Sequence, residues 1–188
     1  MLERFFPNYY TDKVSDLEIA FFTERKIKGI IIDIDNTLID YYENITEDTL
    51  KWIEEIKKSG IKILLLSNNN KDRVDRIGGR LGVDGIYYAS KPRRKGFVSA
   101  MKKMELGNHE ICVIGDQLFT DVYGGNRLNI FTILVKQVHE RDIWITKFKR
   151  PLEKRIMTLY LKNDDRMAKR RDSWKRKSAI SKKIQEKN

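Results

Sequence analysis

Residues 29–38 read Gly-Ile-Ile-Ile-Asp-Ile-Asp-Asn-Thr-Leu, and this stretch decides the fold. Its opening β-branched run is typical of a buried strand, and two aspartates stand where that strand ends. In an extended chain, residues two apart point to the same side, so Asp33 and Asp35 present paired carboxylates. Such a pair needs a cation between its members or a shared proton, and Mg²⁺ suits it. The alternative is a solvated turn or a helix cap.

The chain on both sides of this stretch has an alternating pattern. Between Lys28 and Val135, short β-branched runs alternate with amphipathic stretches, which is typical of βαβ units. The predicted strands are Gly29–Ile34, Ile61–Leu66, Gly85–Tyr88, Ile111–Ile114 and Phe131–Val135. The predicted helices are residues 47–58, a stretch from residue 70 or 71 to just before Gly82, about 95–105 and roughly 118–128. Because such apolar strands need cover on both faces, we expect a doubly wound, mostly parallel, Rossmann-like α/β sheet of about five strands.

Further polar residues follow the other predicted strands, where ligands of such sheets bind. Ser67 and Asn68 follow the second strand, at a helix N-terminus that suits a phosphate or has plain capping groups. Lys91 follows the third strand and can pair with a carboxylate and with phosphoryl oxygens, although lysine is common in this chain. Asp116 ends the fourth strand, and Asp121, about a helical turn later, can support it or a metal-bound water. An N-cap role is the alternative for Asp116.

The net charge of +11 belongs to the end of the chain. From residue 147 onward there are sixteen Lys and Arg against five Asp and Glu, a difference of +11, so residues 1–146 balance. We therefore expect one globular domain over residues 1–146 and a basic tail over 147–188 that is helical or partly disordered. The one cysteine, Cys112, lies in an apolar run, which indicates a small buried side chain in a reducing compartment. No stretch is apolar for long enough to span a membrane.

Taken in chain order, these polar residues resemble the four motifs of the haloacid dehalogenase superfamily. The matching residues are Asp33, Asp35 and Thr37 for motif one, Ser67 for motif two, Lys91 for motif three, and Asp116 with Asp121 for motif four. Three further stretches look like the subfamily IIIA phosphatases, and they are Pro7-Asn8-Tyr9-Tyr10, Ser67-Asn68-Asn69 and Gly124-Gly125-Asn126-Arg127. That group includes the phosphatidylglycerophosphate phosphatases.

The resemblance implies a Mg²⁺-dependent phosphatase, a phosphoric monoester hydrolase that works by covalent catalysis. Asp33 is then the nucleophile, and Asp35 is the general acid and base. The implied metal ligands are Asp33, the backbone carbonyl of Asp35, and Asp116. The residues implied to bind the phosphoryl group are Ser67, Asn68 and Lys91, with Thr37 and Asp121 in support.

The gaps between the motifs leave no room for a cap domain. Leu38 to Ile61 holds little more than one helix, and Ser67 to Lys91 holds one helix and a short strand. Superfamily members with small diffusible substrates usually insert a cap in one of these gaps, so the resemblance implies an open site and a large substrate. We expect phosphatidylglycerophosphate or a similar membrane-surface substrate. The alternatives are phosphoprotein or nucleic-acid ends, or a non-catalytic RNA- or ribosome-binding module on the same fold.

The tail suggests where the protein works. One side of its helical stretch, flanked by Lys and Arg, is apolar and consists of Ile145, Phe148, Leu152, Ile156 and Leu159. Such a helix can lie on an anionic membrane or dock on the core, and the pattern leaves both open. The basic run 169–177, which includes Trp174, equally suits RNA phosphates. We expect a cytoplasmic protein with possible peripheral contact to the inner membrane surface, and nucleic acid as the less favoured partner.

Overall fold

A computed structural model describes residues 2–138 and 150–162 of the chain. The chain divides into two compact units, Met1–Asp142 and Ile143–Asn188, and each is described by itself. The second unit contains α7 (Arg150–Lys162), which includes three residues of the predicted apolar side, Leu152, Ile156 and Leu159. The other two, Ile145 and Phe148, and the basic run 169–177 lie outside the described residues. The domain boundary at residue 146 and the function of the tail therefore stay predictions.

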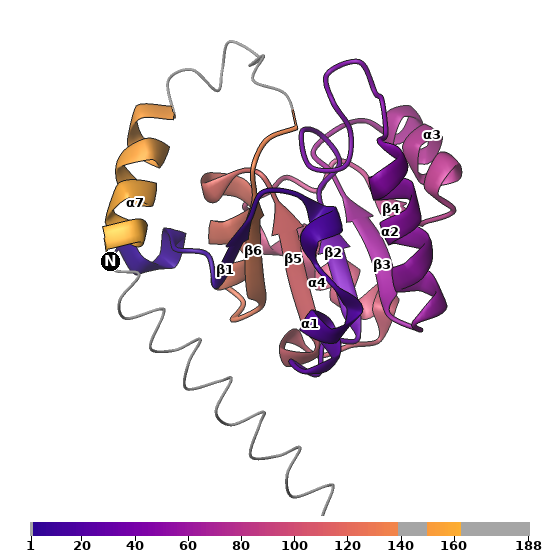
Figure 1. The fold of residues 1–188 in the computed structure, drawn as a ribbon, viewed down its shortest axis with the longest axis horizontal. Helices are drawn as coiled ribbons and strands as arrows, with labels where there is room; N and C mark the ends of the chain where they lie inside the picture. The colour runs from indigo at the N-terminus through magenta and orange to yellow at the C-terminus, as the bar shows by residue number, and fades with distance from the viewer. Residues whose placement is uncertain (1, 139–149, 163–188) are drawn as a thin grey trace, which may run out of the picture. The chain divides into compact units, whose positions relative to one another are not determined.

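The first unit is built on one six-stranded sheet in which every pairing is parallel (Figure 1). Its strands are β1 (Tyr9–Thr11), β2 (Gly29–Ile32), β3 (Lys62–Leu66), β4 (Gly85–Ile86), β5 (Ile111–Gly115) and β6 (Phe131–Val135). They lie in the order β1-β6-β5-β2-β3-β4. The predicted parallel α/β sheet is confirmed. Strand β1 is an addition to the five predicted strands, because three edge residues that pair with β6 carry no apolar run.

Three of the four predicted helices lie within about two residues of their predicted bounds, whereas a short helix before β2 was not predicted. The helices of the first unit are α1 (Ile19–Thr23), α2 (Glu47–Lys58), α3 (Lys71–Leu81), α4 (Arg94–Met104) and α5 (Tyr123–Asn126), with short 3₁₀ turns at Leu2–Phe5, Val14–Asp16 and Asn108–Glu110. The predicted fourth helix is instead a π-helical turn, η4 (Leu118–Val122), that runs into α5. Capping sets the ends of α3, because the side chain of Asn70 accepts a hydrogen bond from Arg73 N at 3.0 Å and Gly82 ends the helix with φ of 60°.

The core consists of two apolar layers, one on each face of the sheet. Alternate residues of β2 point to opposite faces, so Ile30 and Ile32 pack in one layer and Ile31 in the other. The first layer also holds buried side chains of α1, α2 and α3, among them Phe22, Trp52 and Ile77. The second holds α4 through Phe97, Ala100 and Met104. Burial on both faces is the reason that these strands read as continuous apolar runs.

The strand order changes direction between β2 and β5. From β2 the chain proceeds outward through β3 and β4, whereas β5 lies on the other side of β2 and leads to β6. In doubly wound sheets, ligands bind at such a point, outside the carboxyl ends of the strands. Residues 33–46 form a loop and residues 67–84 contain α3 alone, so neither gap holds a cap domain. Among the described residues, no helix has the length and apolar character needed to cross a membrane.

Candidate active site

Three aspartates meet at the carboxyl ends of β2 and β5. Asp33 directly follows Ile32, the last residue of β2, and its N–H donates a hydrogen bond to Ile114 O of β5 at 2.9 Å. Asp116 directly follows β5. Asp121 comes from the π-helical turn η4. One carboxylate oxygen from each residue lies within 4.8 Å of the other two, and all three residues are buried. The structure therefore brings together acidic residues that are up to 88 positions apart, from 33 to 121.

Lys91 lies among these carboxylates. Its Nζ donates to Oδ1 of Asp33 at 2.5 Å and to Oδ1 of Asp121 at 2.7 Å. The three side chains are 4%, 7% and 2% exposed, so these are buried ion pairs. Pairs of this kind are costly to break, because the partner that stays behind is left charged and away from water. Lys91 therefore holds the nucleophile candidate and the supporting aspartate in one fixed arrangement.

The cluster carries more negative charge than Lys91 can balance. Burial raises the pKa of Asp33 to about 7, against the lowering effect of the Lys91 charge. Burial likewise raises the pKa of Asp116 well above its usual range, and the charges of Asp33 and Asp121 add to this. Burial alone would lower the pKa of Lys91, but the charges of Asp121 and Asp33 outweigh it and raise this pKa. One ammonium thus faces three carboxylates, and a divalent cation would bring the sum of the charges to zero.

An unsatisfied oxygen marks the place where a cation fits. Asp116 Oδ2 accepts a hydrogen bond of 2.8 Å from Gln137 Nε2, whereas the buried Oδ1 has no hydrogen-bond partner among the described residues. A buried carboxylate oxygen without a donor is costly unless a metal ion completes it. Carboxylate oxygens are ligands that Mg²⁺ and similar hard cations prefer. The residues present therefore fit a divalent metal, and Asp33 and Asp116 are the side chains to hold it.

Ser67 and Asn68 follow β3 beside Lys91, as the sequence predicts. Asn68 Oδ1 accepts from Lys91 N at 2.7 Å, and its Nδ2 donates to Lys91 O at 3.3 Å. The Asn68 side chain therefore fixes the Lys91 backbone, and its predicted contact with a phosphoryl group stays a prediction. Ser67 is 1% exposed, and its Oγ accepts from Asn69 N at 3.1 Å. Thr37 is also buried, and its Oγ1 has no partner among the described residues.

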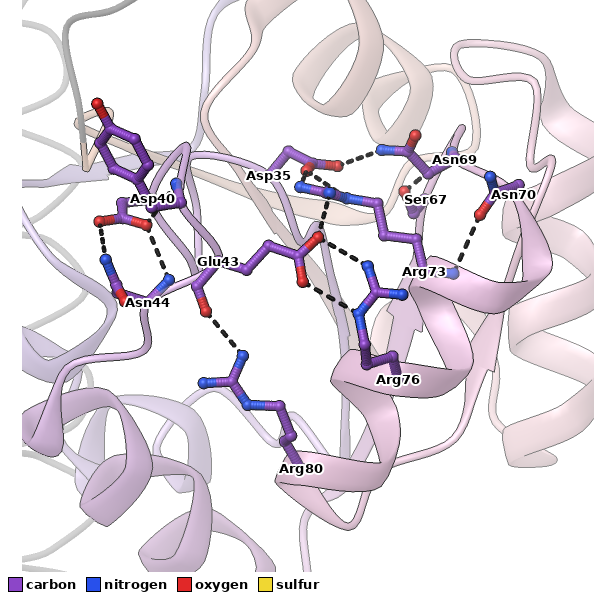
Figure 2. A network of polar contacts seen from close by, with 11 residues as sticks. Asp35, Asp40, Glu43, Asn44, Ser67, Asn69, Asn70, Arg73, Arg76 and Arg80 are labelled. Carbon is purple, nitrogen blue, oxygen red and sulfur yellow. Dashed lines mark hydrogen bonds and ion pairs between the residues drawn. The ribbon is translucent and has the colours of Figure 1, made fainter.

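Asp35 lies apart from the aspartate cluster, although it is only two residues from Asp33. A tight turn follows it, in which Asn36 has φ of 58° and its N–H donates to Ile39 O at 2.9 Å. Asp35 Oδ2 accepts from Asn69 Nδ2 at 2.7 Å, and Oδ1 accepts from Arg73 Nη2 at 2.7 Å (Figure 2). Its side chain is 34% exposed, in contrast to the buried Asp33. The two carboxylates predicted as a pair thus have different surroundings, one dry and one in reach of water.

Two residues of this site, Gln137 and Arg73, were not identified from the sequence, and Asn69 was identified only as part of a motif, with no role of its own. Gln137 follows the last strand, and Asn69 and Arg73 lie after β3 and on α3. The position of Gln137 just after a strand was a usable signal, because Asp33, Ser67 and Asp116 each directly follow a strand as well. Arg73 had no such signal, since a single arginine on a charged helix is ordinary.

The chain is similar in sequence to known hydrolases and phosphatases. A family model described as "Hydrolase: haloacid dehalogenase-like hydrolase" matches residues 41–129. "Probable phosphatase YqeG" of Bacillus subtilis (strain 168) is 44% identical over 160 residues, which cover 84% of this chain and 93% of that protein. "Phosphoglycolate phosphatase" of Methanospirillum hungatei JF-1 is 27% identical over 110 residues, or 56% of this chain and 47% of that protein.

A solved structure of an uncharacterized protein from Listeria monocytogenes serotype 4b superimposes with a TM-score of 0.50. It is 16% identical and the match covers 62% of this chain and 86% of that one, so the likeness concerns the fold alone. The sequence relationship is the stronger one, because identity of 44% extends over nearly the whole length of the Bacillus protein. By this relationship and by the matching family model, the chain belongs to the haloacid dehalogenase-like hydrolases, and it is a phosphatase of that family.

Proposed function

We propose that this phosphatase is a Mg²⁺-dependent phosphomonoester hydrolase that acts through an aspartyl-phosphate on Asp33. The observation that carries the proposal is the buried Asp33–Lys91 pair beside Asp116, whose Oδ1 has no hydrogen-bond partner among the described residues. Bound Mg²⁺, held by Asp33, the Asp35 carbonyl and Asp116, would offset negative charge on the nucleophile and the phosphate. Phosphatases of this family depend on a metal ion, and the charge of this cluster calls for one.

The protein's own residues divide the chemistry between them. An oxygen of Asp33 attacks phosphorus and the bond from phosphorus to the leaving oxygen breaks, while Asp35 gives a proton to that oxygen. Asp35 then takes a proton from the water that attacks phosphorus, which releases phosphate and restores Asp33. Lys91 keeps Asp33 oriented and faces the transferring oxygens, with Ser67 and backbone N–H groups beside it. The exposure of Asp35 supports this division, because a proton carrier must exchange with water.

For the substrate, we propose a phosphate displayed on a large or membrane-bound molecule, with phosphatidylglycerophosphate as the specific candidate. The absence of a cap between β2 and α2 and between β3 and β4 supports this, since the site has no lid of its own. Exposed tyrosines in the loops after β2 and β4 support it further, with exposed fractions of 57% for Tyr41, 59% for Tyr42 and 65% for Tyr88. Tyrosine is favoured at membrane–water interfaces, where its ring contacts lipid and its hydroxyl contacts water. Peripheral attachment to anionic lipid through the basic tail belongs to the same proposal.

The test is phosphate release from phosphatidylglycerophosphate in vesicles, with and without Mg²⁺, by the full chain and by Asp33→Asn. The expected result is turnover that needs the metal and disappears in the variant. A phosphopeptide, a 5′-phosphorylated oligonucleotide and an aryl phosphate are assayed in parallel. If the aryl phosphate is cleaved but the lipid is not, the substrate proposal fails while the phosphatase chemistry stands. If Asp33→Asn keeps full activity, the proposed nucleophile is wrong.

A further inference from the structure

One acidic residue, Glu43, is held by three arginines of α3 (Figure 2). It lies in the loop between β2 and α2 and adopts a left-handed conformation with φ of 63°. Arg76 donates to Glu43 Oε1 at 2.8 Å and to Oε2 at 3.1 Å, and Arg80 donates to its backbone carbonyl at 2.7 Å. The third is Arg73, which donates to Oε1 through Nη1. Arginines at spacings of three and four residues share one side of a helix, and here that side faces the protein's own loop.

Arg73 differs from the other two arginines because it also contacts Asp35. Its Nε and Nη2 both donate to Asp35 Oδ1, at 3.1 Å and 2.7 Å, and its Nη1 donates to Glu43 Oε1. All three nitrogens of the planar guanidinium thereby donate hydrogen bonds, which fixes its orientation. The side chains of Arg73, Asp35 and Glu43 are 25%, 34% and 24% exposed, so the contacts are half-buried. Arg73 is a bridge between the loop and the carboxylate.

The backbone beneath Arg73 is also fixed. Its N–H donates to the N-cap Asn70 at 3.0 Å, in the first turn of α3. The preceding Asn69 donates to the other oxygen of Asp35 at 2.7 Å. Both oxygens of Asp35 are thus positioned from one short segment, residues 69–73. The hydrogen bond from Arg76 lowers the pKa of Glu43, and the charges of all three arginines add to this, so Glu43 stays ionised and keeps attracting Arg73.

We propose that Arg73 is a positioning residue for phosphoryl transfer, one that orients Asp35 for its proton transfers; this rests on the proposed role of Asp35 as general acid and base. A carboxylate two residues from the nucleophile on a loop has free rotamers, and proton transfer requires a defined position. Arg73 removes that freedom, since it contacts Asp35 from a rigid helix. Glu43 in turn holds the far side of the guanidinium. The loop, α3 and the proton carrier therefore form one unit.

The test uses a series of phosphate monoesters whose leaving groups range from activated phenols to simple alcohols. An alcohol is a poor leaving group and needs a proton, whereas an activated phenol needs little help, so the dependence of kcat/KM on the leaving group reports the acid. We expect Arg73→Ala to lower kcat/KM for alkyl phosphates on the order of tenfold and for activated aryl phosphates much less. Arg73→Lys keeps the charge but loses the simultaneous contacts to Asp35 and Glu43. Its kcat/KM for alkyl phosphates should lie between those of the unmodified protein and Arg73→Ala. Thermal unfolding confirms that both variants fold.

The matched control is Arg76→Ala, which removes a second partner of Glu43 from the same helix without a contact to Asp35. Its leaving-group dependence should match that of the unmodified protein. If Arg76→Ala reproduces the Arg73→Ala profile, the effect comes from the loop and direct positioning of Asp35 is refuted. A uniform loss across all leaving groups in Arg73→Ala refutes it as well, as does a gain in activity, which would mean that Arg73 restrains Asp35.

A double-variant comparison separates this proposal from the one it rests on. In an Asp35→Asn background, Arg73→Ala should cost no more than about twofold further, because its target is already gone. If the fold losses in kcat/KM of the two single variants multiply in the double variant instead, Arg73 acts independently of Asp35. If Asp35→Asn alone leaves the leaving-group dependence unchanged, the proposed role of Asp35 fails. If Asp35→Asn alters it and Arg73→Ala does not, the positioning role alone fails.

Discussion

Lys91 Nζ lies 2.5 Å from Oδ1 of Asp33, and both side chains are almost fully buried. The two residues are 58 positions apart and follow different strands, so only the folded sheet brings them together. Because the same ammonium also binds Asp121 at 2.7 Å, Lys91 connects the end of β2 to the π-helical turn η4. This shared contact is the basis of the predictions on stability and metal binding below.

Replacing Lys91 with Met should destabilise the metal-free protein by roughly 3–5 kcal/mol, because buried carboxylates lose their partner. Urea unfolding in the presence of a chelator measures this. Lys103→Met is the control, since the Lys103–Asp84 pair of 2.9 Å is 47% and 74% exposed and should contribute less than about 1 kcal/mol. If both variants lose the same free energy of unfolding, the buried pair contributes no more to stability than the exposed one, and the prediction is wrong.

The stability of the metal-free protein should depend on pH through Asp33, whose pKa is raised by burial from 3.8 to about 7. The folded state then binds this proton more tightly than the unfolded chain, so the contribution of Asp33 to stability falls as pH rises from about 4 to about 7. Asp33→Asn cannot lose a proton, and its stability should therefore increase relative to the unmodified protein over that range. Thermal unfolding in chelator at both ends of the range gives the difference. A constant difference would contradict the prediction.

Gln137→Ala should weaken metal binding by about 10- to 100-fold, because Gln137 Nε2 orients Asp116 through a hydrogen bond of 2.8 Å. Titration calorimetry with Mg²⁺ on the purified protein measures the affinity directly and needs no substrate. Asn126→Ala is a useful comparison, since Asn126 contacts Thr132 and the N-terminal segment and no aspartate of the cluster in the described structure. If the two variants lose affinity alike, the loss reflects general loosening.

Gly115→Ala should lower both activity and stability, the latter by about 1–3 kcal/mol. A Cβ at Gly115 would lie 2.4 Å from Cγ of Asp121, which would displace that carboxylate from Lys91. Gly79→Ala is the matched control, because a Cβ there meets nothing within 4 Å and the residue lies inside α3. Alanine favours a helix interior over glycine by roughly 0.5–1 kcal/mol, so this control should be slightly stabilised. Denaturant unfolding and an aryl phosphatase assay distinguish the two variants.

Much of the fold could be predicted because the signals are local. The apolar runs of β2, β3, β5 and β6 have no polar face, which is a property of a sheet covered on both sides. The caps of α2 and α3 are single residues, Thr46 and Asn70, with donors three positions later. Strand β1 escaped prediction because its stability comes from its pairing with β6, Tyr9 opposite Ile133, and from no pattern of its own. The π-helical turn η4 escaped prediction because its hydrogen bonds span five residues, as in Val122 N to Gln117 O, and those of an α-helix span four.

What the sequence by itself determined is the set of candidate residues, because parallel strands all end at the same edge of a sheet and a polar residue after an apolar run must lie there. The tertiary structure decided how those residues divide. Asp33 lies in the buried cluster with Lys91, whereas Asp35 contacts Asn69 and Arg73 and is partly exposed to water. That division depends on distances between segments far apart in the chain, which no local sequence pattern records. Because burial and neighbouring charges differ at the two positions, two aspartates of one motif have different chemistry.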